Sequence, residues 1–289
     1  MRTIVWQEKS RYALVTCINN GRGVVVEKVI APESVNSQNA HWVNETSMYF
    51  REKLRELGVL LAEPYTFAEE GGKAIQTSPY VGLALNKVFH KGEGTTAILE
   101  NLISTIGGVL SQQVAEVGID ARLSNFCLGP DNRVYYVDTF PPLVKYKGKY
   151  IVHFPNPTDQ MVIRQEIGRK FDHLGILRRL RFSILQDTGT TEADIMLAVR
   201  NIMGGSFASE VEAFFQTLPD NKDIEVALAE LSLDEPDAIR ELALRFMPPK
   251  GEERDKYFDA VFDLSSNFCP LKITPEERVS RIRNLFVQK

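Results

Sequence analysis

The chain has 289 residues, of which 44% are hydrophobic and 25% charged, with a formal net charge of −4. This composition is that of a globular protein with an ample core in one or two lobes, and the charge gives no reason to expect a nucleic-acid partner. Three scattered cysteines without zinc-ligand spacing indicate neither a disulfide framework nor a zinc site. The N-terminus lacks an apolar signal segment and no stretch reaches membrane-spanning length, so we expect a cytoplasmic protein without a membrane partner.

The first part of the chain reads as strands around one helix. β-branched runs predict strands over 3–7, 12–18 and 23–30, with a turn at Asn19-Asn20-Gly21-Arg22, and a hairpin over 65–69 and 73–77. Apolar residues at helical spacing predict a helix over 41–57, which Gly58 ends. The segment 78–82 interrupts this pattern. We therefore expect a small lobe over 1–80.

The remainder, 81–289, reads as mostly helical. An apolar helix is expected around 98–117, and polar or acidic stretches near 187–192 and 218–237 read as loops between helices. Two β insertions interrupt the helices: a hairpin over 126–137 that turns at Gly129-Pro130-Asp131-Asn132, and another over 146–154 that turns at Lys147-Gly148-Lys149.

The most informative motif lies beside the first of these hairpins. Asp120 is followed by Asn125 in an Asp-x-x-x-x-Asn pattern, and Asp138 comes directly after the hairpin. This is the pattern of kinase-fold phosphotransferases. One carboxylate orients or deprotonates the attacking hydroxyl, and an amide oxygen with a second carboxylate holds Mg²⁺ on the phosphates. We expect the hairpin to bring Asn125 and Asp138 side by side.

A phosphate-binding lysine is expected on a strand of the small lobe, held by a glutamate on the helix that follows. Lys28 lies in the β-branched run Val24–Val29 and is the candidate. Glu45, near the start of the helix, is its expected partner, and Glu52 is the weaker choice. Both could instead be ordinary surface residues, with Glu45 complementing the helix dipole.

Together, Lys28, Glu45, Asp120, Asn125 and Asp138 make the chain resemble the aminoglycoside phosphotransferase and choline-kinase-like branch of the protein-kinase-like fold. The resemblance implies an α+β fold of two lobes, a small antiparallel β lobe with one helix and a larger helical lobe. It implies a Mg²⁺-dependent phosphotransferase that moves the γ-phosphate of ATP or GTP to a hydroxyl of a small molecule. In it, Asp120 is the catalytic base or hydroxyl-positioning residue, Asn125 and Asp138 bind Mg²⁺, and Lys28 contacts the phosphates.

The same resemblance makes 78–81 a hinge whose backbone offers hydrogen bonds to the nucleotide base. Ser78, Tyr80 and Val81 are therefore candidate nucleotide-binding residues.

Several features depart from the family pattern. Gly118 stands where the family usually has a histidine, and the first strand turn, 8–11, has no glycine, although Ser10 could serve there. A pseudokinase or nucleotide-binding module without turnover is the alternative that these departures favour. Nucleotidyl transfer onto protein, another kinase-fold enzyme that acts on a protein, and an α/β protein with coincidental spacing also stay open. The sequence does not indicate the oligomeric state.

The charge of the acceptor is open at this stage. Acidic residues are plentiful over 220–237 and read best as a solvated surface. A basic series follows the motif instead and would favour an anionic or phosphorylated acceptor if it borders the pocket. Its members are Lys145, Lys147, Lys149, Arg164, Arg169, Lys170, Arg178, Arg179 and Arg181. The simpler interpretation is a solvated basic helix face, and His153 and His173 read as ordinary polar residues.

Overall fold

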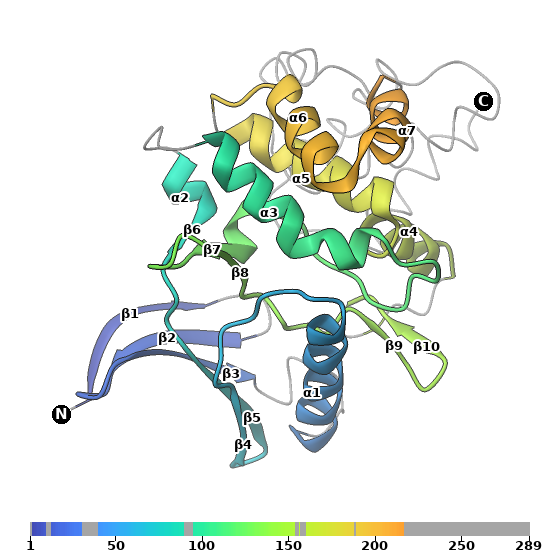
Figure 1. Cartoon of the computed structure of the whole chain (residues 1–289). Helices are drawn as coiled ribbons and strands as arrows, with labels where there is room; N and C mark the ends of the chain where they lie inside the picture. Colours follow the sequence, from blue (N-terminus) through green and yellow to red (C-terminus); the bar gives the residue numbers. More distant parts are fainter. Residues whose placement is uncertain are drawn as a thin grey trace, which may run out of the picture.

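The computed structural model describes residues 2–9, 13–30, 40–89, 95–153, 156, 160–187 and 189–216. It is an α+β protein with an N-terminal antiparallel β lobe and helices after it, as Figure 1 shows with the sheet below and the helices above. The sheet has the spatial order β1 (Thr3–Lys9), β2 (Ala13–Asn19), β3 (Val24–Ile30), β5 (Lys73–Pro79) and β4 (Thr66–Glu70). The strands expected in this region are confirmed within a few residues.

Helix α1 (Ala40–Glu56) packs against β4 and β5 and closes one face of the sheet. Its buried positions Val43, Ser47, Phe50 and Leu54 recur at helical spacing. The helix ends where Gly58 adopts a φ of +77°, a left-handed conformation that glycine reaches without strain. The predicted helix and its glycine stop are confirmed.

A second small sheet joins the β lobe to the helices. It has the order β6 (Leu83–Ala84), β7 (Phe126–Leu128) and β8 (Val134–Tyr136), all antiparallel. The segment after α1 attaches to its outer strand, because the backbone N–H of Tyr136 donates to Leu60 O at 2.9 Å. A separate hairpin, β9 (Val144–Tyr146) and β10 (Lys149–Ile151), turns at 147–148 and lies beside α1 in Figure 1. Both predicted hairpins are confirmed.

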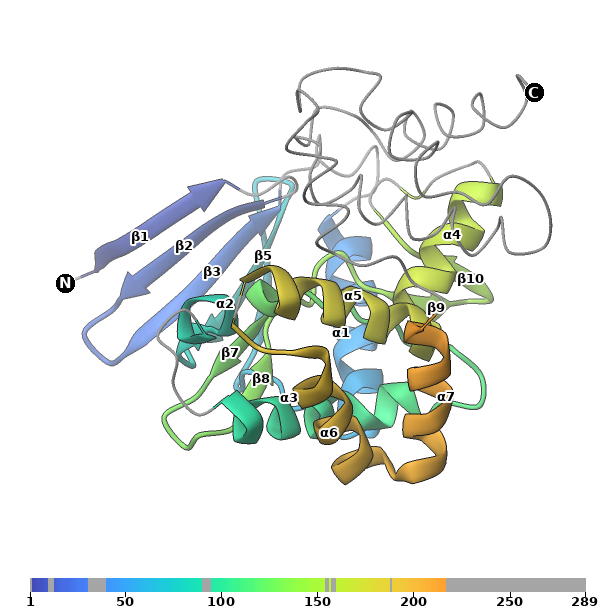
Figure 2. The same cartoon turned by 90° about the horizontal axis from the view of Figure 1, so that it is seen from above.

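The helical part is built from α2 (Leu85–Phe89), α3 (Thr95–Leu110), α4 (Gln160–Lys170), α5 (His173–Asp187), α6 (Glu192–Met203) and α7 (Gly205–Phe215). Helix α3 is central: it packs against α5, α6 and β8, and Leu99, Leu102, Ile103 and Ile106 are fully buried in the core. Figure 2 shows α3, α5 and α6 between the sheet on one side and α4 and α7 on the other. None of the helices in the described residues is long and apolar enough to cross a membrane.

Helix α3 is shorter than the expected 98–117. It ends at Leu110 because the Gln112 side chain bonds the following backbone: its Oε1 accepts from the N–H of Glu116 and Val117. Its Nε2 donates to Val109 O and Val117 O. The apolar sequence favours continuation of the helix, but the Gln112 side chain offers the backbone groups of 109–117 an alternative set of hydrogen bonds in a turn. The loop expected near 187–192 is confirmed, and the acidic stretch 218–237 lies outside the described residues.

Candidate functional site

The β7–β8 hairpin brings Asn125 and Asp138 together, as expected. Phe126 pairs with Tyr136, and one step beyond this pair the N–H of Val137 donates to Asn125 O at 3.0 Å. A short 3-10 turn, Leu123–Asn125, leads into β7. Asn125 is 7% exposed and its Nδ2 donates to the backbone oxygen of Asp120 at 2.9 Å, so the side-chain amide also fixes the Asp120 loop. Its Oδ1 is left to act as an acceptor, at 3.4 Å from Ser124 Oγ.

Lys28 reaches this segment from the sheet. Its Nζ lies 3.2 Å from Asp138 Oδ1 and donates to Val137 O at 3.4 Å. The Lys28 and Asp138 side chains are 17% and 27% exposed, so the pair is partly buried. Burial acts to lower the pKa of Lys28, but the charge of Asp138, the neighbouring Tyr65 and the hydrogen bond to Asp138 together outweigh burial, so the pKa is raised. Lys28 is therefore a fixed cation at the junction of the sheet and the hairpin.

Glu45 does not contact Lys28, and the expected pairing is wrong. The Tyr146 hydroxyl donates to Glu45 Oε1 at 2.5 Å, and Lys147 Nζ lies 3.5 Å from the same oxygen. The hydrogen bond from Tyr146 is the main cause of the lowered pKa of Glu45. Glu45 thus ties α1 to the β9–β10 hairpin, while the carboxylate that contacts Lys28 is Asp138.

Helix α1 reaches the Asp138 segment through Arg51, a residue that sequence reasoning missed. Arg51 is 2% exposed, and its Nη2 donates to Ala62 O and to Glu63 Oε1, both at 2.8 Å. Its guanidinium lies 3.5 Å from the centre of the Tyr65 ring, and Nη1 lies 3.4 Å from the hydroxyl oxygen of Thr139, next to Asp138. The available signal was an arginine between Phe50 and Leu54 on the apolar stripe of the helix.

Asp120 is held between two guanidinium groups. Arg122 Nη2 lies 2.5 Å from Oδ2, and Arg179 Nε of α5 lies 3.1 Å from Oδ1. Burial alone would raise the pKa of Asp120, but the nearby cations, Arg122 and Arg179 first and then Lys170 and Arg169, together outweigh it and hold the pKa well below its usual range. The backbone N–H of Asp120 donates to the Tyr136 hydroxyl oxygen at 3.4 Å. Asp120 is consequently a permanent anion near neutral pH.

The geometry explains why glycine stands at 118. A Cβ there would lie 2.7 Å from the backbone oxygen of Lys170 and 2.9 Å from the Phe171 ring, so no side chain fits. The end of α4 takes that space, and Lys170 O accepts from the N–H of Ile119 at 2.7 Å. The loop is thus tied to the end of α4 by the backbone bond from Ile119 and to Leu143 O by the N–H of Gly118.

Behind this loop lies a buried ion cluster. Glu166 is 1% exposed and contacts Lys170 Nζ at 2.6 Å and Arg169 Nη2 at 2.9 Å. Lys170 also donates to Val152 O at 2.7 Å. Burial acts to raise the pKa of Glu166, but the two cations outweigh it and lower the pKa to about 2. Through the bond from Lys170 to Val152 O, the cluster fixes the end of α4 to the segment that follows β10.

The basic residues of α5 are largely buried. Arg178, Arg179 and Arg181 are 9%, 6% and 8% exposed, so the interpretation as a solvated basic helix face is wrong for them. Lys147 is exposed and pairs with Glu45, away from Asp120. His173 contacts Glu210 at 3.1 Å, a bond between helices. Arg179, a member of the basic series, contacts Asp120 directly.

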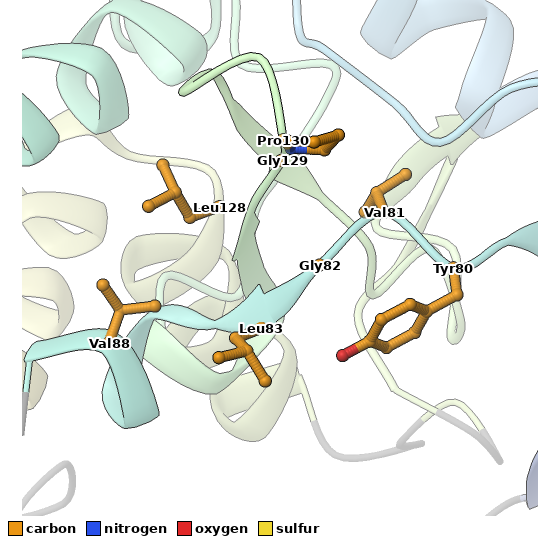
Figure 3. A pocket seen from close by; sticks show the side chains of 8 residues that line it. All are labelled: Tyr80, Val81, Gly82, Leu83, Val88, Leu128, Gly129 and Pro130. Carbon is orange, nitrogen blue, oxygen red and sulfur yellow. The ribbon is translucent and has the colours of Figure 1, made fainter. Parts of the chain in front are cut away.

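The expected hinge links the two sheets. Ser78 pairs with Val26 at the end of β5, and the N–H of Tyr80 donates to Val24 O at 2.9 Å, so this N–H is used within the lobe. Tyr80 and Val81 line an open pocket of about 440 Å³, shown in Figure 3. Its other lining residues are Gly82, Leu83, Val88, Leu128, Gly129 and Pro130. The surface of the pocket is mostly apolar.

The side chains of Asn125 and Asp138 could hold a metal ion only through their oxygen atoms. Groups of three or more His, Cys, Asp or Glu side chains that could bind an ion do not occur in the described residues. Asn125 and Asp138 offer an amide oxygen and a carboxylate on adjacent ends of one hairpin. Such oxygen donors are the ligands that Mg²⁺ prefers, and one or two protein ligands plus substrate phosphates are its usual set. The pair therefore supplies side-chain oxygens of the types that bind Mg²⁺. Ser10 lies outside the described residues.

Comparison with known proteins assigns no family. No protein-family model matches the chain, and no curated protein matches it.

Proposed function

We propose that this protein is a Mg²⁺-dependent phosphotransferase that moves the γ-phosphate of ATP or GTP to a hydroxyl of a small molecule. The observation that carries the proposal is the contact of Lys28 Nζ with Asp138 Oδ1 at 3.2 Å, directly after the β7–β8 hairpin. Asn125, directly before the same hairpin, is bonded to the Asp120 loop through Asp120 O. Sequence-distant residues of the types that phosphoryl transfer needs thus come together at one point between the sheet and the helices.

The proposed nucleotide side has two parts. Lys28 binds the phosphates, and its present bond to Asp138 holds the ammonium group in place until the nucleotide arrives. The pocket at 80–83 takes the base, with Tyr80, Val81 and Leu128 as apolar contacts. Asn125 and Asp138 would hold Mg²⁺, which when bound neutralises charge on the phosphates.

The proposed acceptor side is centred on Asp120. Because its pKa is held low by Arg122 and Arg179, Asp120 stays charged and accepts a hydrogen bond from the acceptor hydroxyl. It therefore orients the hydroxyl oxygen toward the phosphorus, a positioning role that suits a loose transition state in which little proton transfer is needed early.

Ligand-dependent thermal stability tests this proposal. ATP, GTP and ADP, each with and without Mg²⁺, are added to the wild type, Asp138→Asn and Lys28→Met. A ligand at 100 times its Kd stabilises the fold by about 2.7 kcal/mol, a readily measured rise in Tm. We expect Mg²⁺-dependent stabilisation of the wild type, lost in Asp138→Asn and reduced with or without metal in Lys28→Met.

The matched control is Lys73→Met, on the exposed end of β5 in the same sheet, which should bind as the wild type does. Absence of stabilisation by every nucleotide would refute the nucleotide site. Stabilisation that survives Asp138→Asn in full would refute the metal assignment.

A nucleotide-binding module without turnover is the second candidate. It is favoured by one observation: each carboxylate oxygen of Asp120 already contacts a guanidinium group. The two candidates differ in product. Release of labelled phosphate or a labelled acceptor from γ-labelled ATP supports the transferase, and tight Mg·ATP binding without either supports the binding module.

A further inference from the structure

Arg122 lies two residues after Asp120, on the same loop. The N–H of Arg122 donates to Asp120 O at 2.9 Å, so a tight turn points the side chain back across the loop. The guanidinium contacts Asp120 Oδ2, and the charge of Asp138 acts on it as well. Its side chain is nevertheless 46% exposed, in contrast to Asp120 at 15%. Arg122 therefore contacts Asp120 and faces solvent.

The charges around Asp120 are predominantly positive. The neighbours that act most strongly on its carboxyl group are Arg122, Arg179, Lys170 and Arg169, all of them cations. The carboxylate of Glu166 faces Arg169 and Lys170 within the buried cluster, at 2.9 and 2.6 Å. A cationic acceptor that approached Asp120 would thus meet like charge on the way.

A guanidinium group offers paired N–H donors whose geometry matches the oxygens of a carboxylate or a phosphate. In the structure, Arg122 uses one of these donors, Nη2, on Asp120 Oδ2. A hydroxyl that reaches Asp120 must come within reach of the same guanidinium, because Nη2 lies 2.5 Å from Oδ2 and Arg122 is the more exposed of the two side chains.

We propose that Arg122 recognises an oxyanion on the acceptor, so that the acceptor is an anionic hydroxy compound carrying a phosphate or carboxylate group. This inference rests on the proposed phosphotransferase function. It makes Arg122 a specificity residue: acidic acceptors are preferred over neutral ones, and amines are disfavoured.

Binding of small charged probes to the nucleotide complex tests the inference. The nucleotide site is first saturated with Mg²⁺ and the β,γ-imido analogue of ATP, so that the γ-phosphate position is filled. Inorganic phosphate, glycolate and ethanolamine are then titrated by calorimetry into the wild type, Arg122→Gln and a control, Arg200→Gln. Arg200 is 55% exposed and pairs with Glu212 across α6 and α7.

We expect phosphate or glycolate to bind the wild-type complex and Arg200→Gln alike, and ethanolamine to bind neither. Stronger binding of phosphate identifies a phosphorylated acceptor, and stronger binding of glycolate a carboxylated one. Arg122→Gln should weaken binding of the anion at least tenfold, since a hydrogen bond to a charged group contributes about 1.5 to 3 kcal/mol. The Kd of the ATP analogue should stay within about twofold of the wild type.

Three results would overturn the inference. The first is equal anion binding in Arg122→Gln and the wild type. The second is weakened binding of the ATP analogue in Arg122→Gln, which would assign Arg122 to the γ-phosphate. The third is preferential binding of ethanolamine. If the analogue itself fails to bind the wild type, the proposed function fails as well, and this outcome is distinct because it precedes addition of any probe.

Asp120→Asn supplies a reciprocal measurement. Loss of the carboxylate releases Arg122 from its present contact, so the anion should bind this variant more tightly than the wild type. Weaker anion binding in Asp120→Asn would contradict the assignment of Arg122 to the acceptor.

Discussion

Replacement of Arg51 by methionine tests whether α1 is anchored to the site segment through a buried guanidinium. The Arg51 side chain is 3% exposed, and Arg55, one turn later on α1, is 60% exposed. Both approach Glu63 Oε1, Arg51 at 2.8 Å and Arg55 at 3.9 Å. The two residues therefore form a pair on one helix that differs in burial and in the number of contacts.

The expected cost follows from the contacts. Arg51→Met removes two charged hydrogen bonds, to Ala62 O and Glu63, each contributing about 1.5 to 3 kcal/mol, and the contact with the Tyr65 ring. Methionine fills much of the space and avoids burial of a charge, which offsets part of the loss. We expect a net loss of about 2 to 4 kcal/mol, or a fall in Tm of roughly 3 to 7 °C for a chain of this size.

Arg55→Met should change stability by less than about 0.5 kcal/mol, because an exposed pair contributes little. Urea unfolding followed by circular dichroism measures both variants. Equal losses in Arg51→Met and Arg55→Met, or a loss below about 1 kcal/mol in Arg51→Met, would refute the argument that burial makes Arg51 an anchor.

Three further outcomes are expected. Gly118→Ala should lower stability by about 1 to 3 kcal/mol, because its Cβ would overlap the end of α4. Gly168→Ala, within α4 and with open space for a Cβ, should be neutral or slightly stabilising. Thermal unfolding measures both variants. Glu166 has a pKa lowered from 4.5 to about 2, so its contribution is present above about pH 4.5 and lost as pH falls toward 2. The stability gap between the wild type and Glu166→Gln, measured by urea midpoints, should therefore narrow over that range, and a constant gap would contradict the linkage. Glu45→Gln should leave Mg·ATP affinity within about twofold of the wild type, because Glu45 does not contact Lys28. A loss of affinity as large as that of Lys28→Met would instead support the pairing of Glu45 with Lys28 that the sequence predicted.

The sequence alone determined the local elements. Turn residues between β-branched runs predicted the sheet strands and both hairpins, because a hairpin is closed by neighbouring hydrogen bonds and its turn chemistry is local. The spacing of Asn125 and Asp138 across one such hairpin then predicted their proximity, and the backbone bond from Val137 to Asn125 agrees with it. The phosphotransferase function itself stays a prediction.

Tertiary structure decided which side chains meet across long separations in the chain. Sequence spacing placed a carboxylate on α1 near Lys28, but the direction in which α1 packs turns Glu45 toward the β9–β10 hairpin and Arg51 toward the site. Likewise, Gly118 reads as the loss of a family residue until the end of α4 is seen to occupy its space. The physical reason is that helix period and strand alternation fix which residues share a face. The angle at which two elements pack, which depends on the whole core, decides what that face contacts.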